Sequence, residues 1–198
     1  MVEKRFTNKV VIITGASRGI GLACAERFKE EGAKVCTIQR SNSKLFDSYE
    51  FDLTREQDCL KSIEAIFNKY GCIDVLINNA GMMEEFSLQD TTLDSWNQTL
   101  SLNLTAPFLM SKFVMPHLIN SKGCIVNIGS IEGIGANPKH AAYCASKAGL
   151  HGLTRAIAVD HGEDDIRCNA VAPGWIDTEL NEDFINSMPD PEYFRKNI

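Results

Sequence analysis

The sequence lacks the features that mark several large classes of protein. Its net charge is −6, with 20 Lys and Arg against 26 Asp and Glu, which argues against broad attraction to nucleic acid or an anionic membrane. No apolar run approaches the roughly 20 residues that cross a bilayer, and Met1–Phe6 contains no apolar signal region. We therefore expect a cytoplasmic protein without nucleic-acid or membrane partners.

The chain also lacks the cysteine and histidine patterns of disulfide and metal sites. Its 7 cysteines are scattered, odd in number and without a C-x-x-C pair, which indicates free thiols in a reducing compartment. No H-E-x-x-H motif or His/Cys cluster is present, so we expect no bound metal. We interpret the four histidines as surface or helix-end residues.

What is present is typical of an ordinary globular chain. Its 198 residues are 44% hydrophobic and 23% charged, which fits a single domain over 1–198. A domain of this size buries roughly 70% of its unfolded surface and needs no disulfide or metal for stability.

Short β-rich runs alternate with helical patterns along the whole chain. The strands are expected at Val10–Ile13, Lys34–Gln39, Tyr49–Leu53, Val75–Ile77, Ile125–Ile128 and Cys168–Ala172. Helices are expected at about 19–32, after a capping box at Thr54–Gln57, and at roughly 91–118 and 141–160. The eleven residues between Arg40 and Asp52 leave room for an extended loop or a single turn only. This alternation predicts an α/β doubly wound parallel sheet, Rossmann-like, with strand order 3-2-1-4-5-6 and ligands beyond the carboxyl ends of its strands.

A glycine-rich segment, Thr14–Gly21, joins the first strand to its helix. Gly15 permits a tight turn, Gly19 lets the backbone approach a pyrophosphate, and Gly21 brings helix and sheet close together. Free N–H groups at the helix start would then face the phosphates. Three glycines alone also fit a purely structural turn, but their place after the first strand favours a dinucleotide.

The end of the second strand bears on the choice of nicotinamide cofactor. NAD-binding folds usually place an acidic residue there to hold the ribose hydroxyls, and this chain has Gln39 followed by Arg40. Arg18 reaches toward the same region, and two guanidiniums suit a 2′-phosphate. We expect NADP(H), with NAD(H) possible; the alternative is that both arginines are simply solvated.

Three residues form a candidate catalytic group. Tyr143 and Lys147 stand at i and i+4 on one helix face, where an ammonium would stabilise a phenolate whose ordinary pKa is about 10. By itself this pair also fits a helix-surface contact. Ser130 follows the fifth strand, at the edge where substrates bind, and its hydroxyl can donate to a substrate oxygen.

Asn103 is a fourth candidate. It lies on the apolar stripe of its helix, where an amide needs partners. Pro107, four residues later, has no N–H, so the carbonyl of Asn103 is free to hold a water. The alternative is a proline kink beside an ordinary buried asparagine.

Several motifs in order resemble the short-chain dehydrogenase/reductase family, in its non-extended branch. They are T-G-x-x-x-G-x-G at 14–21, Asp52-Leu53-Thr54, Asn78-Asn79-Ala80-Gly81, Asn103, Ser130, Tyr143-x-x-x-Lys147 and Pro173-Gly174-Trp175-Ile176-Asp177-Thr178. The resemblance implies that Tyr143 is the acid/base and that Lys147 binds the nicotinamide ribose and lowers the tyrosine pKa. It further implies that Ser130 polarises the carbonyl and that Asn103 holds a relay water.

The family also implies a cofactor-binding surface and a reaction. The implied cofactor residues are Gly15, Ser17, Arg18, Gly19, Ile20, Gly21, Arg40, Asp52, Leu53, Asn79, Ala80, Gly81, Tyr143, Lys147, Pro173, Gly174, Ile176 and Thr178. The expected function is hydride transfer between the nicotinamide and a carbonyl or secondary alcohol.

The sequence says less about the substrate. Glu132, His140 and Trp175 are candidate substrate residues, although a carboxylate in the position of Glu132 is more often solvated. Small ketones, sugars or polyols, and acyl-thioester ketones all remain open.

Members of the family continue beyond the point matching Ile198 into a substrate-covering helix and a seventh strand, which this sequence lacks. That difference supports an alternative: a catalytically silent NADP-binding or interaction protein. Small residues at 141, 142, 145, 148 and 149 favour a homodimer or homotetramer, or else ordinary core packing.

Overall fold

A single six-stranded parallel sheet forms the centre of the protein. The computed structural model describes residues 3–179, 182–186 and 188–197. The strands are β1 (Val10–Thr14), β2 (Lys34–Gln39), β3 (Asp47–Glu50), β4 (Val75–Asn78), β5 (Cys124–Ile128) and β6 (Arg167–Val171). They lie in the order β3-β2-β1-β4-β5-β6, and each neighbouring pair is parallel. The predicted doubly wound sheet and its strand order are confirmed.

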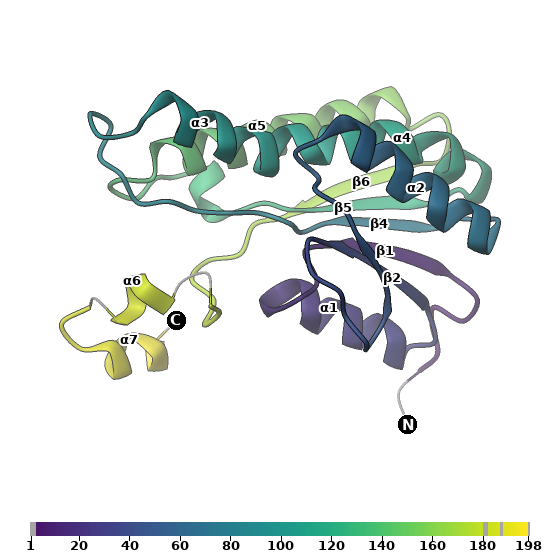
Figure 1. Cartoon of the computed structure of the whole chain (residues 1–198), viewed down its shortest axis with the longest axis horizontal. Coiled ribbons are helices and arrows are strands. Elements are labelled where there is room, and N and C mark those ends of the chain that lie inside the picture. Colours follow the sequence, from purple (N-terminus) through teal and green to yellow (C-terminus); the bar gives the residue numbers. More distant parts are fainter. Residues whose placement is uncertain (1–2, 180–181, 187, 198) are drawn as a thin grey trace.

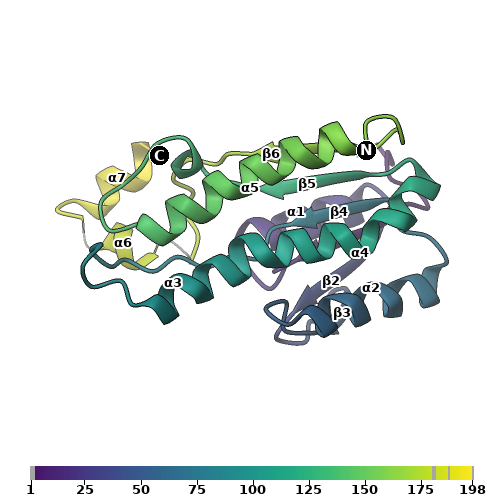
Figure 2. The ribbon, with the colours of Figure 1, turned by 90° about the horizontal axis from the view of Figure 1, so that it is seen from above.

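Helices cover the sheet on both faces (Figure 1). One face carries α1 (Gly19–Glu30), and the other carries α2 (Glu56–Tyr70), α4 (Ala106–Ser121) and α5 (Ala141–Asp160). From above, α3 (Leu93–Leu100) and α4 follow one line beside α5 (Figure 2). Two short helices that the sequence did not predict, α6 (Glu182–Asn186) and α7 (Pro191–Asn197), follow β6.

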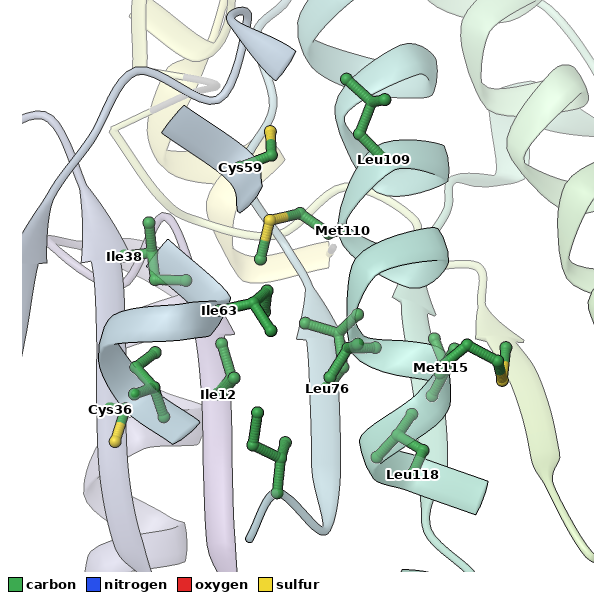
Figure 3. Packing of buried hydrophobic residues seen from close by; sticks show 14 of the residues in the cluster. Ile12, Cys36, Ile38, Cys59, Ile63, Leu76, Leu109, Met110, Met115 and Leu118 are labelled. Atoms are coloured by element: carbon green, nitrogen blue, oxygen red, sulfur yellow. The ribbon is translucent and has the colours of Figure 1, made fainter. Parts of the chain in front are cut away.

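The main core lies between the sheet and helices α2 and α4 (Figure 3). Ile12 and Leu76 of neighbouring strands pack there with Ile63 of α2 and Met110 of α4. Alternate residues of β1 point to the opposite face, where Val11 joins a second cluster beneath α1. All five residues of β1 are therefore buried, which explains why Val10–Ile13 is a continuous apolar run instead of an alternating pattern.

The third strand and the start of α2 differ from the prediction. The strand is Asp47–Glu50 instead of Tyr49–Leu53, because the carboxylate of Asp47 at its start is held by Tyr49, Lys69 and Tyr70. The predicted capping box is wrong. The hydroxyl of Thr54 donates to Asp52 instead of capping the helix, and the N-cap residue is Arg55. No helix lies between β2 and β3, as predicted.

The helix expected over 91–118 is interrupted. A π-helical turn, η1 (Ser101–Thr105), separates α3 from α4, and the N–H of Ala106 donates to the carbonyl of Ser101. Pro107 lacks an N–H and cannot close an α-helical bond to Asn103, so the regular pattern fails at this point. Helix α5 packs tightly on this turn, as its Gly149 shows: a Cβ there would lie only 2.7 Å from Leu104 Cδ2. Gly149, one of the five small residues that suggested either a subunit interface or core packing, therefore packs against its own chain.

Disulfides, metal clusters and membrane-spanning helices are all absent from the part of the chain that the structure describes. All seven cysteines are free thiols there. No group of three or more His, Cys, Asp or Glu side chains among the described residues has a metal-binding arrangement. None of the described helices combines the length and apolarity needed to span a bilayer.

Shortening a core side chain should destabilise the fold. Leu76 is 0% exposed on β4, so Leu76→Ala should lower the free energy of unfolding by about 2–5 kcal/mol through lost burial and a cavity. Leu88→Ala, at a side chain that is 74% exposed, is the matched control and should change it by less than about 0.5 kcal/mol. Urea unfolding measures both; equal effects of the two changes would contradict the assigned core.

Candidate active site

The glycine loop is held against the end of β4 by a set of hydrogen bonds. The hydroxyl of Thr14 accepts from the backbone N–H groups of Asn79 and Ala80, each at 3.0 Å. The amide of Asn79 donates to the carbonyls of Thr14 and Gly15 at 3.0 and 2.9 Å. Gly15 has φ +67°, and a Cβ there would lie 2.7 Å from Ala80 Cα. Only glycine fits this turn.

The first turn of α1 offers unpaired N–H groups to the space beyond the loop. Its N-cap residue, Arg18, makes no side-chain capping bond, and the turn holds no acidic residue. The positive end of the helix dipole is therefore uncompensated by the chain itself, which is the arrangement that binds phosphate.

A cleft of about 620 Å³ runs from this loop to the expected catalytic residues. The expected cofactor residues along it are Gly15, Ser17, Arg18, Gly19, Ile20, Arg40, Asp52, Leu53, Asn79, Ala80, Gly81, Tyr143, Lys147, Pro173, Gly174, Ile176 and Thr178. Gly21 is not on the wall. It packs behind the loop, where a Cβ would collide with Asn79 and the Gly15 carbonyl. The glycine turns, the open helix start and the length of the cleft together fit a dinucleotide.

The loop also matches a motif of another enzyme class. Residues 15–19 read G-x-S-x-G, the pattern of the nucleophilic serine in α/β-hydrolases. Such a serine needs a histidine base within hydrogen-bond reach. No histidine is among the described residues that line the cleft, so the geometry does not support this chemistry at Ser17.

The end of β2 carries a buried amide and an exposed guanidinium. The Gln39 side chain is 6% exposed, and neither its amide nitrogen nor its oxygen has a partner among the described residues. Arg40 and Arg18 are exposed, and all three residues line the cleft. The Asp52 carboxylate stands nearby, its pKa lowered mainly by the hydrogen bond from Thr54. The neutrality of Gln39 is visible in the sequence, but the burial of its amide without a partner is not.

The predicted catalytic residues meet at the far end of the cleft. Lys147 is 5% exposed, and its Nζ donates to the carbonyl of Ile128 at 2.7 Å and lies 5.5 Å from the centre of the Tyr143 ring. Burial lowers the pKa of Lys147 to about 8. Burial raises the pKa of Tyr143, while a hydrogen bond from Ser130 acts in the opposite direction. The side chains alone therefore do not produce the lowered tyrosine pKa that the resemblance implied.

Asn103 lies behind the cleft wall, on the π-helical turn. Its Oδ1 accepts from the N–H of Met82 at 2.9 Å, and its Nδ2 donates to the Met82 carbonyl at 2.8 Å and to the Ser146 hydroxyl at 3.1 Å. The expectation that this buried amide needs partners is confirmed. These bonds fasten the segment after β4 to η1 and α5.

The candidate substrate residues are only partly as expected. Glu132 and Trp175 line the cleft, and His140 does not. The interpretation of Glu132 as a solvated carboxylate is wrong, because it is 6% exposed and is held by hydrogen bonds within the protein. His140 is a helix-end residue, as expected, because it is the N-cap residue of α5, and it is buried beside Glu132. Sequence spacing carried no signal for this pair, because the contact spans an irregular loop.

Two further wall residues and a buried polar cluster were not predicted from the sequence. Gln98 and Leu102 line the cleft from α3 and η1. Behind the strand ends, the Asn78 amide donates to Asn127 at 2.8 Å, and Asn127 donates to Thr154 at 2.9 Å. The i to i+4 spacing of Gln98 and Leu102 is a signal that a helix-face analysis can use.

The buried ammonium of Lys147 should cost stability in a pH-dependent way. Its folded-state pKa of about 8 lies below the ordinary 10.5. Between these two pH values the folded state therefore binds fewer protons than the unfolded state. The cost of burying the Lys147 ammonium is consequently relieved as the pH rises from about 8 to 10.5. The free energy of unfolding of the unmodified protein minus that of Lys147→Met should rise by about 3 kcal/mol across this window. Denaturant unfolding at several pH values measures it; a pH-independent difference would contradict the burial of a titrating amine.

Comparison with known proteins supports the same reading. The family model described as short chain dehydrogenase matches residues 9–188. A meso-2,3-butanediol dehydrogenase of Serratia marcescens is 36% identical over 197 residues, covering 94% of this chain and 78% of the relative. A 3-oxoacyl-[acyl-carrier-protein] reductase of Thermotoga maritima is 36% identical over 192 residues, covering 90% and 78%.

Solved structures agree in fold as well as sequence. The ligand-free aldohexose dehydrogenase of Thermoplasma acidophilum superimposes with a TM-score of 0.91 at 36% identity, covering 98% of this chain and 78% of that one. The match includes the whole sheet and the motifs that line the cleft. The chain belongs to the short-chain dehydrogenase/reductase family, whose members are NAD(P)(H)-dependent oxidoreductases.

Proposed function

We propose that the protein transfers a hydride between NADP(H) and a ketone or secondary alcohol, with Tyr143 as the acid/base. The observation that carries this proposal is that Ser130, Tyr143 and Lys147 line the same cleft as the glycine loop. A dinucleotide with its phosphates at the loop would extend along this cleft toward the three side chains.

In the direction of reduction, the chain's own groups hold and protonate the substrate oxygen. The nicotinamide, when bound, supplies the hydride to the carbonyl carbon. The hydroxyl of Ser130 accepts from the N–H of Glu132 at 3.1 Å, and its own hydrogen, which is shared with Tyr143 in this structure, would be donated to the carbonyl oxygen of a bound substrate. Tyr143 gives its phenolic proton to that oxygen, which completes the alcohol. Oxidation reverses both transfers.

Lys147 and Asn103 would support this proton transfer from behind. A Cβ on Gly81 would lie 3.7 Å from Lys147 Nζ and 3.3 Å from Asn103 Oδ1, so both side chains border the same glycine of the cleft wall. We assign Lys147 to a ribose hydroxyl and the Asn103 carbonyl to a water that returns protons to it. The interrupted helix favours the second role, because Pro107 has no N–H for that carbonyl.

NADP(H) is favoured over NAD(H) by the charges at the adenosine end. Arg18 and Arg40 line the cleft there, and Gln39 stands where a carboxylate would repel a 2′-phosphate. Arg40→Ala should therefore weaken NADPH binding about tenfold or more, since one charge-assisted hydrogen bond contributes about 1.5–3 kcal/mol. NADH binding should hardly change. Fluorescence titration with both dinucleotides measures this, and a wild-type protein that binds NADH as tightly as NADPH would refute the preference.

Tyr143→Phe should abolish turnover and leave NADPH affinity unchanged, because only the proton donor is lost. We expect a loss of at least about 100-fold in kcat, the usual contribution of a positioned acid/base. Tyr193→Phe, which removes the same hydroxyl from α7, is the matched control and should keep full activity. NADPH oxidation followed by absorbance provides the measurement. Substantial remaining activity in Tyr143→Phe would exclude it as the acid/base.

The rival function is an NADP-binding or interaction protein without turnover. Its test is a panel of ketones, aldehydes, sugars and acyl-thioester ketones, chosen because the relatives are named for a diol and for an acyl carrier substrate. NADPH binding without oxidation on any member would favour the rival. The assembled group of Ser130, Tyr143 and Lys147 favours the enzyme.

A further inference from the structure

A buried polar cluster lies beside the proposed catalytic residues and has no role in the scheme above. Its centre is the Glu132 carboxylate, 6% exposed, whose Oε1 accepts from Asn137 Nδ2 at 2.9 Å. Its Oε2 lies 2.8 Å from His140 Nδ1 and accepts from Cys144 Sγ at 3.3 Å. Burying a carboxylate costs free energy unless its lone pairs are satisfied, and three neighbours do so here.

The cluster joins the two segments that carry the reacting groups. Glu132 belongs to the short 3₁₀ turn η2 (Ile131–Gly133), and its N–H donates to the Ser130 hydroxyl at 3.1 Å. His140 immediately precedes α5, and Cys144 follows Tyr143 in its first turn. One carboxylate therefore fastens the serine loop to the start of the tyrosine helix.

The carboxylate also places a negative charge beside the phenol. The His140 ring meets the Tyr143 ring edge-on with centroids 6.2 Å apart. The Glu132 carboxylate is hydrogen-bonded to both His140 and Cys144, which flank Tyr143 in the sequence. Burial is the main cause of the raised pKa of Tyr143, and the charge of Glu132 adds to it by opposing phenolate formation. Among the described residues, the other titratable groups near this point are His140 and Cys144 at the start of α5, Lys147 one turn later, and Glu85 after β4, whose carboxylate lies 3.9 Å from His140 Nε2.

We propose that Glu132 is a positioning residue that aligns Ser130 with Tyr143 and keeps the Tyr143 hydroxyl protonated. The proposal rests on the proposed role of Tyr143 as the acid/base. A phenol held in its protonated form is ready to donate to a substrate oxygen, so the cluster biases the site toward carbonyl reduction at neutral pH. Alcohol oxidation, which needs the phenolate, should require alkaline conditions.

The decisive experiment titrates Tyr143 directly, without dinucleotide or substrate. Phenolate formation is followed by ultraviolet absorbance in Glu132→Gln and in the unmodified protein, each corrected by subtraction of its Tyr143→Phe counterpart. The chain contains 4 tyrosines, so this subtraction isolates the one of interest. Removing the negative charge should shift the midpoint of the Tyr143 transition to lower pH. The pH profile of kcat/KM for alcohol oxidation should move in the same direction.

Two variants separate charge from structure. Asn137→Ala removes one hydrogen bond to the carboxylate and keeps its charge, so its midpoint should stay close to that of the unmodified protein. Glu132→Asp, which retains the charge, should also restore most of the original midpoint. If Glu132→Gln does not fold, the double change Glu132→Gln with His140→Gln replaces it, because the two amides can hydrogen-bond to each other.

Three outcomes would overturn the inference. They are an unchanged or higher midpoint in the charge-free variant, an equal shift in Asn137→Ala, and a loss of activity in Glu132→Gln without any movement of the pH profile. Failure of the proposed function is distinguishable, because it appears as absent turnover in the unmodified protein, whereas the phenolate titration is read without turnover.

Discussion

The hydrogen bonds between the ends of β1 and β4 are the constraint on which the site depends. In a doubly wound sheet the chain reverses its direction of progress between these strands, which opens a gap at their carboxyl ends. Thr14 and Asn79 bridge that gap with side-chain to backbone bonds. They fix the glycine loop on one side and the segment with Gly81 on the other. Asn103 and Lys147 then pack against that segment, so the two ends of the cleft share one support.

Buried polar groups, each with a specific partner, build the far end of the cleft. Lys147 binds a strand carbonyl, Asn103 binds both backbone groups of Met82, and Glu132 is held by three side chains. Burying such groups costs free energy unless each one is hydrogen-bonded, and a fully hydrogen-bonded network favours a single arrangement of the side chains. The polar groups at this edge of the sheet therefore reduce the stability of the fold, and the apolar core between the sheet and helices α2 and α4 compensates for that loss.

Sequence patterns predicted the sheet and most of the cleft because their physics is local. A buried parallel strand is a continuous apolar run, as at Val10–Ile13, and a glycine turn at 15–21 follows from backbone sterics. Two of the failures involved contacts between separate segments. The start of β3 at Asp47 depends on Lys69 and Tyr70, and the burial of Glu132 depends on a loop that returns to meet it. Neither contact leaves a periodic signal.

The number of residues in the π-helical turn determines which side chains of α3 line the cleft. A turn of this kind accommodates one residue more than an α-helix along the same path, and here that residue lies within Ser101–Thr105. Deleting one residue there would remove the extra residue of the π-helical turn and rotate α3 by about 100° relative to α4. Gln98 would leave the wall, and Asn103 would lose its place opposite Met82. Changes in chain length are thus far less tolerable in this segment than in the connection between β2 and β3.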